Sequence, residues 1–456
     1  MPVNSDKPLT IAQRRRAMRL AYSNGMIWAV GNGLASTALV VYLALELGVA
    51  RAGLGIALIL AAPCLAGLLR LGAPAIVGRL VDRKRFCLGC YLLGTCVLLT
   101  LPWASAPGML PSSRGSLSAL IVLWCVYHLM QYLGTIALWS WLADLVPLRI
   151  RGRFIGRRNR WMVVGEAAAM IASGLFVSLW KEWLPSGPKW HPYAISAGLG
   201  ACFMIAAVVP LAMMTRATGR ASSPRASVMQ SIRAPFADPR FLRLVLFGCW
   251  FSLSTGITQS VQYTYTINIL GVGFLALLSM KTGMRGGQFA VSPWMGRLAD
   301  RIGNRSVMIV CLLICSQGPA FYLFATPETW WWITGAWVAW IAYAGLNVCL
   351  PNLMLKLSPE QSNTPYIAMY GAVTGLCYAL NTILGGYLYD ELRDETFQIG
   401  TAVLDYYDYI FLLGWITRSL GVLVLLMVIE PTSSVLTGST ASRPYGSRRS
   451  ESPRRR

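Results

Sequence analysis

The chain has 456 residues, of which 55% are hydrophobic and only 13% charged, and its net charge is +22 at pH 7. A soluble domain could not bury so much apolar surface, so the composition excludes that class and indicates a membrane protein. The positive charge does not indicate nucleic-acid binding, because the basic residues are distributed along the chain in the way that a membrane topology requires.

Twelve apolar stretches are each long enough to cross a bilayer as a helix, which needs about 20 residues. They predict an all-α membrane protein with twelve transmembrane helices. We expect the first stretch to be retained as a helix, because no small-residue processing site follows it. The expected spans are 19–45, 53–77, 86–104, 117–143, 160–180, 193–214, 242–267, 271–295, 306–325, 330–354, 365–388 and 408–430.

Basic residues are concentrated in every second connection between these spans. Most of the 40 Lys and Arg residues lie at the N-terminus, in the even-to-odd connections and in the C-terminal tail. This positive-inside pattern predicts a multi-pass protein of the plasma (inner) membrane with both termini in the cytoplasm. Acidic residues such as Asp390 and Asp405 gather on the opposite side. The few basic residues in the alternate connections are Arg51, Arg114, Lys181, Lys189 and Arg393.

The connection after the second span reads GRLVDR at 78–83, and GRLADR follows the eighth span at 296–301. Further on, Pro147 and Pro359 begin two more segments that correspond at a similar separation. This repetition predicts two six-helix halves in tandem, as in many transporters. We expect the halves at 1–214 and 241–430, with a basic cytoplasmic linker at 215–240 and a disordered basic tail at 431–456.

With these repeated loops the chain resembles the major facilitator superfamily over essentially its whole length. That family carries a G-x-L-a-D-R-x-G-R loop between helices 2 and 3, often repeated between helices 8 and 9. Gly296, Asp300 and Arg301 match well, whereas Arg85 replaces the second glycine of the first copy. The resemblance implies two pseudo-symmetric six-helix halves, alternating access, and a central cavity lined by helices 1, 4, 7 and 10.

We interpret the charged loop as a conformational latch at the cytoplasmic side. Gly78 lets two helices approach closely, and Asp82 can accept hydrogen bonds from free donors at a helix N-terminus. Arg83 would join a charge cluster that breaks when the halves move. The alternative is a basic loop that only sets topology. The expected latch residues are Gly78, Asp82, Arg83, Asp144, Arg153, Gly296, Asp300 and Arg301.

Three ionisable residues within the spans are candidates for proton coupling. In helix 4, His128 occupies the place where the superfamily often has Arg, and histidine titrates near neutral pH. Arg70 and Glu166 each lie roughly 12 Å above the cytoplasmic end of their helix, at 1.5 Å per residue, which permits an ion pair. The alternative for His128 is a neutral side chain hydrogen-bonded inside the bundle.

Polar stripes on otherwise apolar helices predict the face turned toward substrate. Helix 7 carries the clearest stripe, with two glutamines and a tyrosine on one side. The alternative is hydrogen bonding between helices. The expected substrate-binding residues are Asn32, Gln131, Gln259, Gln262, Tyr265, Lys281, Arg285, Gln288 and Asn347.

Helix 8 places Lys281, Arg285 and Gln288 on one face, with Arg285 near the bilayer midplane. No acidic residue lies within helices 7 to 11 before their outer ends, and the only deep acid is Glu166 in the other half. An anionic group on the substrate is therefore the simplest expected partner, because guanidinium binds carboxylate through two hydrogen bonds. The alternative is that the neighbouring glycines loosen the helix and let both cations reach water or backbone carbonyls.

These observations predict a secondary active transporter of a small polar organic solute, with an anionic solute and proton symport as narrower hypotheses. An efflux antiporter and a non-transporting receptor are the rivals. Helix 5 lacks the glycine- and proline-rich pattern of superfamily antiporters, which weighs against efflux. We expect no enzyme activity, cofactor or metal site, because a lone Cys87-x-x-Cys90 pair without nearby His favours packing. The expected partners are the solute, the lipid bilayer and protons.

Overall fold

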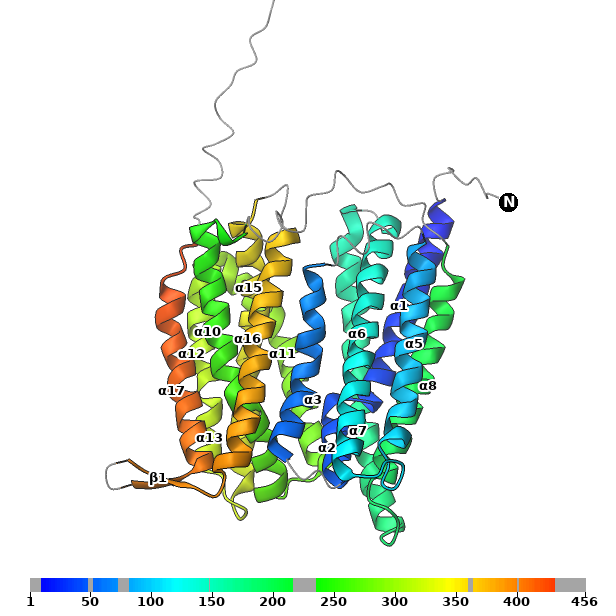
Figure 1. Cartoon of the computed structure of the whole chain (residues 1–456). Coiled ribbons are helices and arrows are strands. Elements are labelled where there is room, and N and C mark those ends of the chain that lie inside the picture. The colour runs from blue at the N-terminus through cyan, green and yellow to red at the C-terminus, as the bar shows by residue number, and fades with distance from the viewer. Residues whose placement is uncertain are drawn as a thin grey trace, which may run out of the picture.

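The computed structural model describes residues 10–47, 52–72, 82–146, 148–215, 235–359, 364–399 and 402–430. Long helices stand side by side in one bundle (Figure 1). Ten described segments are long and apolar enough to cross a membrane. The second expected span corresponds to a shorter apolar helix, and the eighth to a helix whose charged and amide residues lower its hydropathy. The structure therefore confirms the predicted all-α membrane fold.

The first half of the chain supplies six of the spans. The first span consists of two helices, because the Ser36 hydroxyl accepts the Leu39 N–H at 3.4 Å and starts a new helix. This differs from the single helix expected over 19–45. The elements are α1 (Ile11–Leu34), α2 (Thr37–Glu46), α3 (Ala52–Ala66), the 3₁₀ turn η1 (Gly67–Arg70), α5 (Arg83–Ala104), α6 (Ser113–Leu145), α7 (Leu148–Trp183) and α8 (His191–Met213).

The second half repeats this plan with more interruptions, at Gln317 before Gly318-Pro319 and at the tryptophan-rich turns of the tenth span. An antiparallel hairpin pairs Thr396 with Asp405 and was not expected. The elements are α10 (Pro239–Thr264), the π turn η2 (Tyr265–Ile269), α11 (Phe274–Ile302), α12 (Asn304–Ser316), α13 (Gly318–Leu323), η3 (Trp330–Trp332), α14 (Ile333–Ala339), η4 (Trp340–Ala342), α15 (Tyr343–Leu357), α16 (Thr364–Leu392), β1 (Thr396–Ile399), β2 (Ala402–Asp405) and α17 (Tyr406–Leu426).

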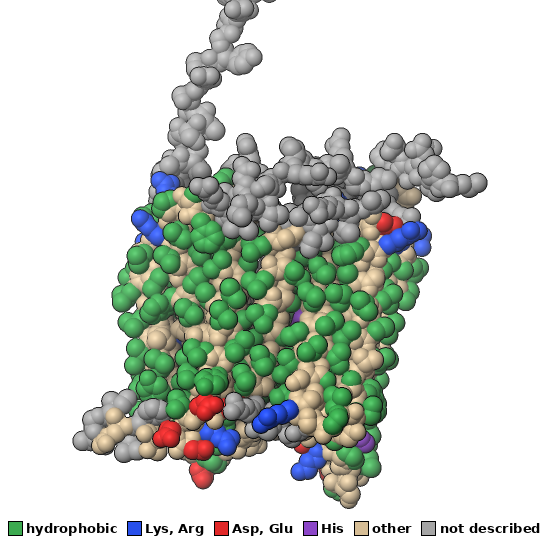
Figure 2. Space-filling view, viewed as in Figure 1, with side chains coloured by type: hydrophobic (Ala, Val, Ile, Leu, Met, Phe, Trp, Pro, Cys, Tyr) green, Lys and Arg blue, Asp and Glu red, His purple; other side chains and the backbone are tan. Residues whose placement is uncertain are grey.

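The start of α1 and the end of α17 lie at the same end of the bundle, which we call the upper end after its place in Figure 1. The β1–β2 hairpin marks the lower end. Hydrophobic side chains cover the middle of the visible face, and charged side chains gather at the two ends (Figure 2). This distribution is the one a bilayer requires, because apolar side chains contact lipid and charges remain in water.

The two halves have separate apolar cores that meet at the lower end. One core is built around Phe241 and Phe247 of α10, and another around Leu39, Trp124 and neighbouring residues of the first half. The latter core also takes in Phe274, Leu277 and Leu278 from the start of α11. α11 of the second half is therefore anchored in the first half.

Further contacts close the lower end between the halves. The Tyr42 hydroxyl donates to the Val272 carbonyl at 2.9 Å. The Asp390 carboxylate at the end of α16 accepts the backbone N–H groups of Gly53 and Leu54, at 2.9 and 2.8 Å, and so caps α3 across the interface. Because these contacts join opposite halves, they must break if the lower end opens.

Candidate functional site

Glu166 of α7 lies where the two halves face each other at mid-depth. Its helix packs tightly on α1, since a Cβ at Gly33 would approach the Glu166 carbonyl oxygen to 2.6 Å. One carboxylate oxygen accepts the Asn32 amide N–H at 3.4 Å. The other lies 3.9 Å from a guanidinium nitrogen of Arg285 in α11. Residues of α1, α7 and α11 thus form one polar cluster across both halves.

This ion pair gives Arg285 an acidic partner from the first half, where the second half has none within its spans. The anionic group on the substrate stays a prediction. The exposed fractions are 44% for the Arg285 side chain and 21% for that of Glu166, so the pair borders an open space. The expected pair of Glu166 with Arg70 stays a prediction, because the Arg70 side chain lies outside the described residues.

A second polar pair lies one helical turn away on α1. The Trp28 indole N–H donates to the Gln131 side-chain oxygen of α6 at 3.2 Å. Gln131 is only 6% exposed, and its amide nitrogen has no partner among the described residues. Trp28 and Asn32 lie one turn apart on one face of α1, so both polar contacts lie on the same side of that helix.

His128 lies one turn before Gln131 on α6. Its ring packs edge-on against Trp124 and Tyr127, with centroid distances of 4.3 and 5.0 Å. The Nε2 atom is buried and has no hydrogen-bond partner within the described part of the chain. The ring is therefore packed among aromatic side chains inside the bundle.

The expected substrate-binding residues of helix 7 have different environments in the structure. Tyr265 donates to the Ala325 carbonyl at 2.7 Å and packs in the second-half core, so it joins helices rather than facing a cavity. Gln262 is 5% exposed, with an amide nitrogen that has no partner among the described residues. Gln259 is half-buried on the same helix.

The polar residues expected on α11 and α15 also have different environments. The Gln288 amide donates to the Trp340 carbonyl at 3.0 Å, a contact between helices that matches the alternative interpretation. Lys281 is half-buried one turn before Arg285, which places a second cation near the ion pair. Asn347 is exposed on α15.

The latch residues are only partly described. Asp82 caps α5 by accepting the Arg85 N–H at 3.0 Å, as expected for an acid at a helix N-terminus, and it also forms an ion pair with the Arg85 side chain at 3.3 Å. Arg83 is the first residue of α5. In the second copy, Gly296 lies within α11, while Asp300 and Arg301 are exposed near its end. Gly78 and the side chains of Asp144 and Arg153 lie outside the described residues.

Sequence reasoning missed one cluster at the upper end. The Glu430 carboxylate accepts hydrogen bonds from the Lys356 ammonium at 2.7 Å, the Asn304 amide at 2.7 Å and the Arg305 backbone N–H at 2.9 Å. A signal existed in the sequence, because Glu430 is an acid at the end of the last expected span, on the side that carries most of the basic residues. Its partners could not be identified without the fold.

The comparisons with known proteins agree with this architecture. The family model described as MFS/sugar transport protein matches residues 25–359, and the one described as Major Facilitator Superfamily matches residues 282–452. No curated protein is a significant match in sequence.

Several solved structures share the fold. The nucleoside transporter NupG has a TM-score of 0.65 at 13% identity, covering 92% of this chain and 99% of that one. The inward-open xylose transporter XylE from E. coli has a TM-score of 0.65 at 10% identity, covering 91% and 96%. An inward-facing, unoccupied bacterial homolog of the human lysosomal transporter Spinster has a TM-score of 0.60 at 15% identity, covering 92% and 96%.

Proposed function

Because the chain belongs to the major facilitator superfamily, we propose that it is a secondary active transporter that moves a small polar organic solute across the membrane by alternating access. The polar cluster of Asn32, Glu166 and Arg285 carries this proposal. It lies at mid-depth, joins the two halves and is partly exposed. A solute bound there would contact both halves at once and so couple its binding to their relative movement.

The side chains of the cluster suit a solute with hydroxyl or carboxylate groups. Asn32 and Gln131 offer amide hydrogen bonds, Trp28 offers a flat ring for an apolar edge, and Gln259 of α10 is a further proposed contact from the second half. Among the described residues, the cluster holds two cations, Lys281 and Arg285, for the single carboxylate of Glu166. This excess of one positive charge favours a solute with one anionic group. Sugars and nucleosides are the alternatives, supported by the names of the matched family and of NupG.

Glu166 is our candidate for proton coupling. Protonation of its carboxyl group would remove the attraction to Arg285 and weaken the one ion pair between the halves that the described residues contain. We propose that proton binding and movement of the halves are linked in this way. His128 and Arg70 are secondary candidates, and the charged loops around Asp82 and Asp300 are the proposed latch at the upper end.

The proposal includes the orientation of the protein in the membrane. The closed lower end, with Asp390 on α3 and Tyr42 on Val272, supports an inward-facing state if the upper end lies in the cytoplasm. The positive-inside pattern favours that placement and a plasma (inner) membrane location. The inward states named for XylE and for the Spinster homolog agree with it.

A reconstitution experiment tests the function. Purified protein is screened for thermal stabilisation by sugars, nucleosides, carboxylates and amino acids, because a ligand at one hundred times its Kd stabilises by about 2.7 kcal/mol. A stabilising solute is then followed as a labelled substrate into proteoliposomes. We expect uptake by the native protein, its loss in Arg285→Gln, and normal uptake in the control Arg393→Gln, which changes an exposed cation at the lower end.

The pH dependence of uptake separates the proton hypothesis from the transport proposal. Glu166→Gln should bind solute but show uptake that no longer varies with pH. A pH profile unchanged from the native one would reject proton coupling through Glu166 while leaving transport intact. Binding without flux in the native protein would instead favour the receptor, and the absence of both binding and flux for every class would contradict the proposal.

A further inference from the structure

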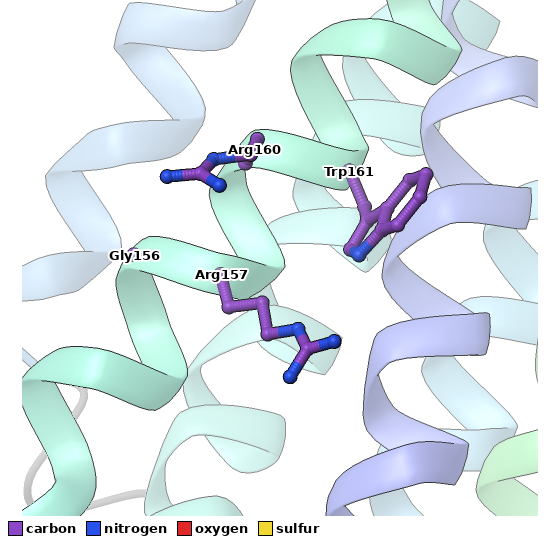
Figure 3. A pocket seen from close by; sticks show the side chains of 4 residues that line it. All are labelled: Gly156, Arg157, Arg160 and Trp161. Atoms are coloured by element: carbon purple, nitrogen blue, oxygen red, sulfur yellow. The ribbon is translucent and has the colours of Figure 1, made fainter.

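A cavity of about 520 Å³ lies beside the upper part of α7, and Glu166 does not line it. Gly156, Arg157, Arg160 and Trp161 line it. Figure 3 shows the Arg160 side chain on one side of the helix and those of Arg157 and Trp161 on the other. The cavity therefore combines two guanidinium groups with an indole ring and a glycine.

The cavity lies at the upper limit of the lipid-facing stripe of α7. Trp161 is 44% exposed, and Val164, Leu175 and Leu179 continue an exposed apolar stripe toward the lower end. Near that end α7 packs against α11, where a Cβ at Gly174 would lie 2.9 Å from the Leu275 side chain. Arg157 lies one turn above Trp161 on the same stripe, which places it at headgroup level.

The two arginines are available for an anion. The Arg157 guanidinium lies over the Tyr22 ring, 5.7 Å from its centroid, and that ring stacks on Phe154 at 5.0 Å. This stacking orients the guanidinium and leaves the N–H groups at its edge free. Both arginines are exposed, and neither has an acidic partner among the residues that the structure describes.

We propose that this pocket binds the phosphate group of an anionic phospholipid from the leaflet at the upper end. Guanidinium groups recognise phosphate through charge-assisted hydrogen bonds, and tryptophan is typical of the interface where headgroups lie. The apolar stripe directly below the pocket offers the acyl chains a surface that a free phosphate ion would not use.

Lipid retention in native mass spectrometry tests the proposal. The full chain in detergent is titrated with phosphatidylglycerol or with phosphatidylcholine of the same acyl chains. We expect preferential retention of phosphatidylglycerol, with an affinity about fivefold lower in Arg157→Gln and in Arg160→Gln. Arg297→Gln is the matched control, because Arg297 also lies over a tryptophan, Trp294, but outside the cavity.

A variant that fills the cavity distinguishes lipid binding in the pocket from attraction to surface charge alone. A Cβ at Gly156 would meet no atom within 4 Å, so Gly156→Leu should fold and occupy the cavity while both arginines remain. It should lose the preference for phosphatidylglycerol, and a native-like thermal transition would show that it is folded. A retained preference in this variant, or an equal loss in Arg297→Gln, would overturn the pocket. Equal retention of the two lipids by the native chain, or full displacement of phosphatidylglycerol by inorganic phosphate, would overturn the lipid assignment.

Discussion

Glu430 shows how one side chain at the upper end organises several elements. Glu430 follows α17 in the chain. Its carboxylate joins the start of α12 to Lys356 near the end of α15. Burial raises the pKa of this carboxyl group, but the hydrogen bonds from the Arg305 N–H, Lys356 and Asn304 outweigh burial and lower the pKa to about 2. The charged form is therefore strongly favoured in the folded protein.

This depressed pKa predicts a pH dependence of stability. The group contributes fully above its ordinary pKa of about 4.5, and its contribution is lost as the pH falls toward about 2. Glu430→Gln should lower stability by about 1–3 kcal/mol at neutral pH, because hydrogen bonds to a charged group are lost. In thermal unfolding, the difference in Tm between native protein and variant should shrink as the pH is lowered below 4.5.

Glu182→Gln is the control, because Glu182 is exposed. Its effect should stay within about 0.5 kcal/mol. A Tm difference between native protein and Glu430→Gln that is constant down to acidic pH would contradict the role assigned to the carboxylate.

At the scale of elements, α3 and α16 hold the lower end closed. Asp390 places its negative charge on the free N–H groups at the start of α3, where the helix dipole favours an anion. The backbones approach closely there, since a Cβ at Gly53 would lie 2.6 Å from the Gly386 carbonyl oxygen. Both features join the two halves at the lower end.

Variants at this contact should open the lower end. Asp390→Ala removes a cap worth about 1 kcal/mol, and Gly53→Val introduces a clash with α16. Spin labels at Met109 and Glu328, on a cysteine-depleted background, report the distance between the halves at this end. We expect a larger population of long distances in both variants.

Asp394→Ala is the matched control, because Asp394 is an exposed acid at the same end whose ion pair is with its neighbour Arg393. An unchanged distance distribution in both Asp390→Ala and Gly53→Val would show that this contact does not hold the halves together.

At the scale of the whole molecule, each half has its own core, and the two are joined through pairs such as α3 with α16 and α7 with α11. The proposed division at 1–214 and 241–430 therefore predicts that the halves fold and assemble as separate chains. Co-expression of residues 1–228 with residues 229–456 should give a complex that co-purifies, because the break falls in the basic linker and leaves every transmembrane helix whole.

The matched control moves the break into α7, between residues 171 and 172, where it interrupts a membrane helix. That pair should not form a stable complex. Failure of the first pair to assemble, with both chains present in the membrane, would contradict the division into halves.

The sequence by itself determined the class of the protein and the helical spans. In lipid every backbone polar group must be satisfied within its own segment, so length and hydropathy suffice to predict where helices cross. The repeated GRLVDR and GRLADR loops identified the two halves, and the cap formed by Asp82 followed from local backbone chemistry. All of these depend on residues close together in the chain.

Only the tertiary structure decided which polar side chains meet. Glu166 pairs with Arg285 because α7 and α11 of opposite halves lie together, and nothing near either residue in the sequence specifies that partner. The same holds for Gln288 and Tyr265, whose side-chain donors bond to the backbone carbonyls of Trp340 and Ala325. A stripe shows that a helix face is polar, but the packing of two halves determines whether that face meets a helix, a charge or an open space.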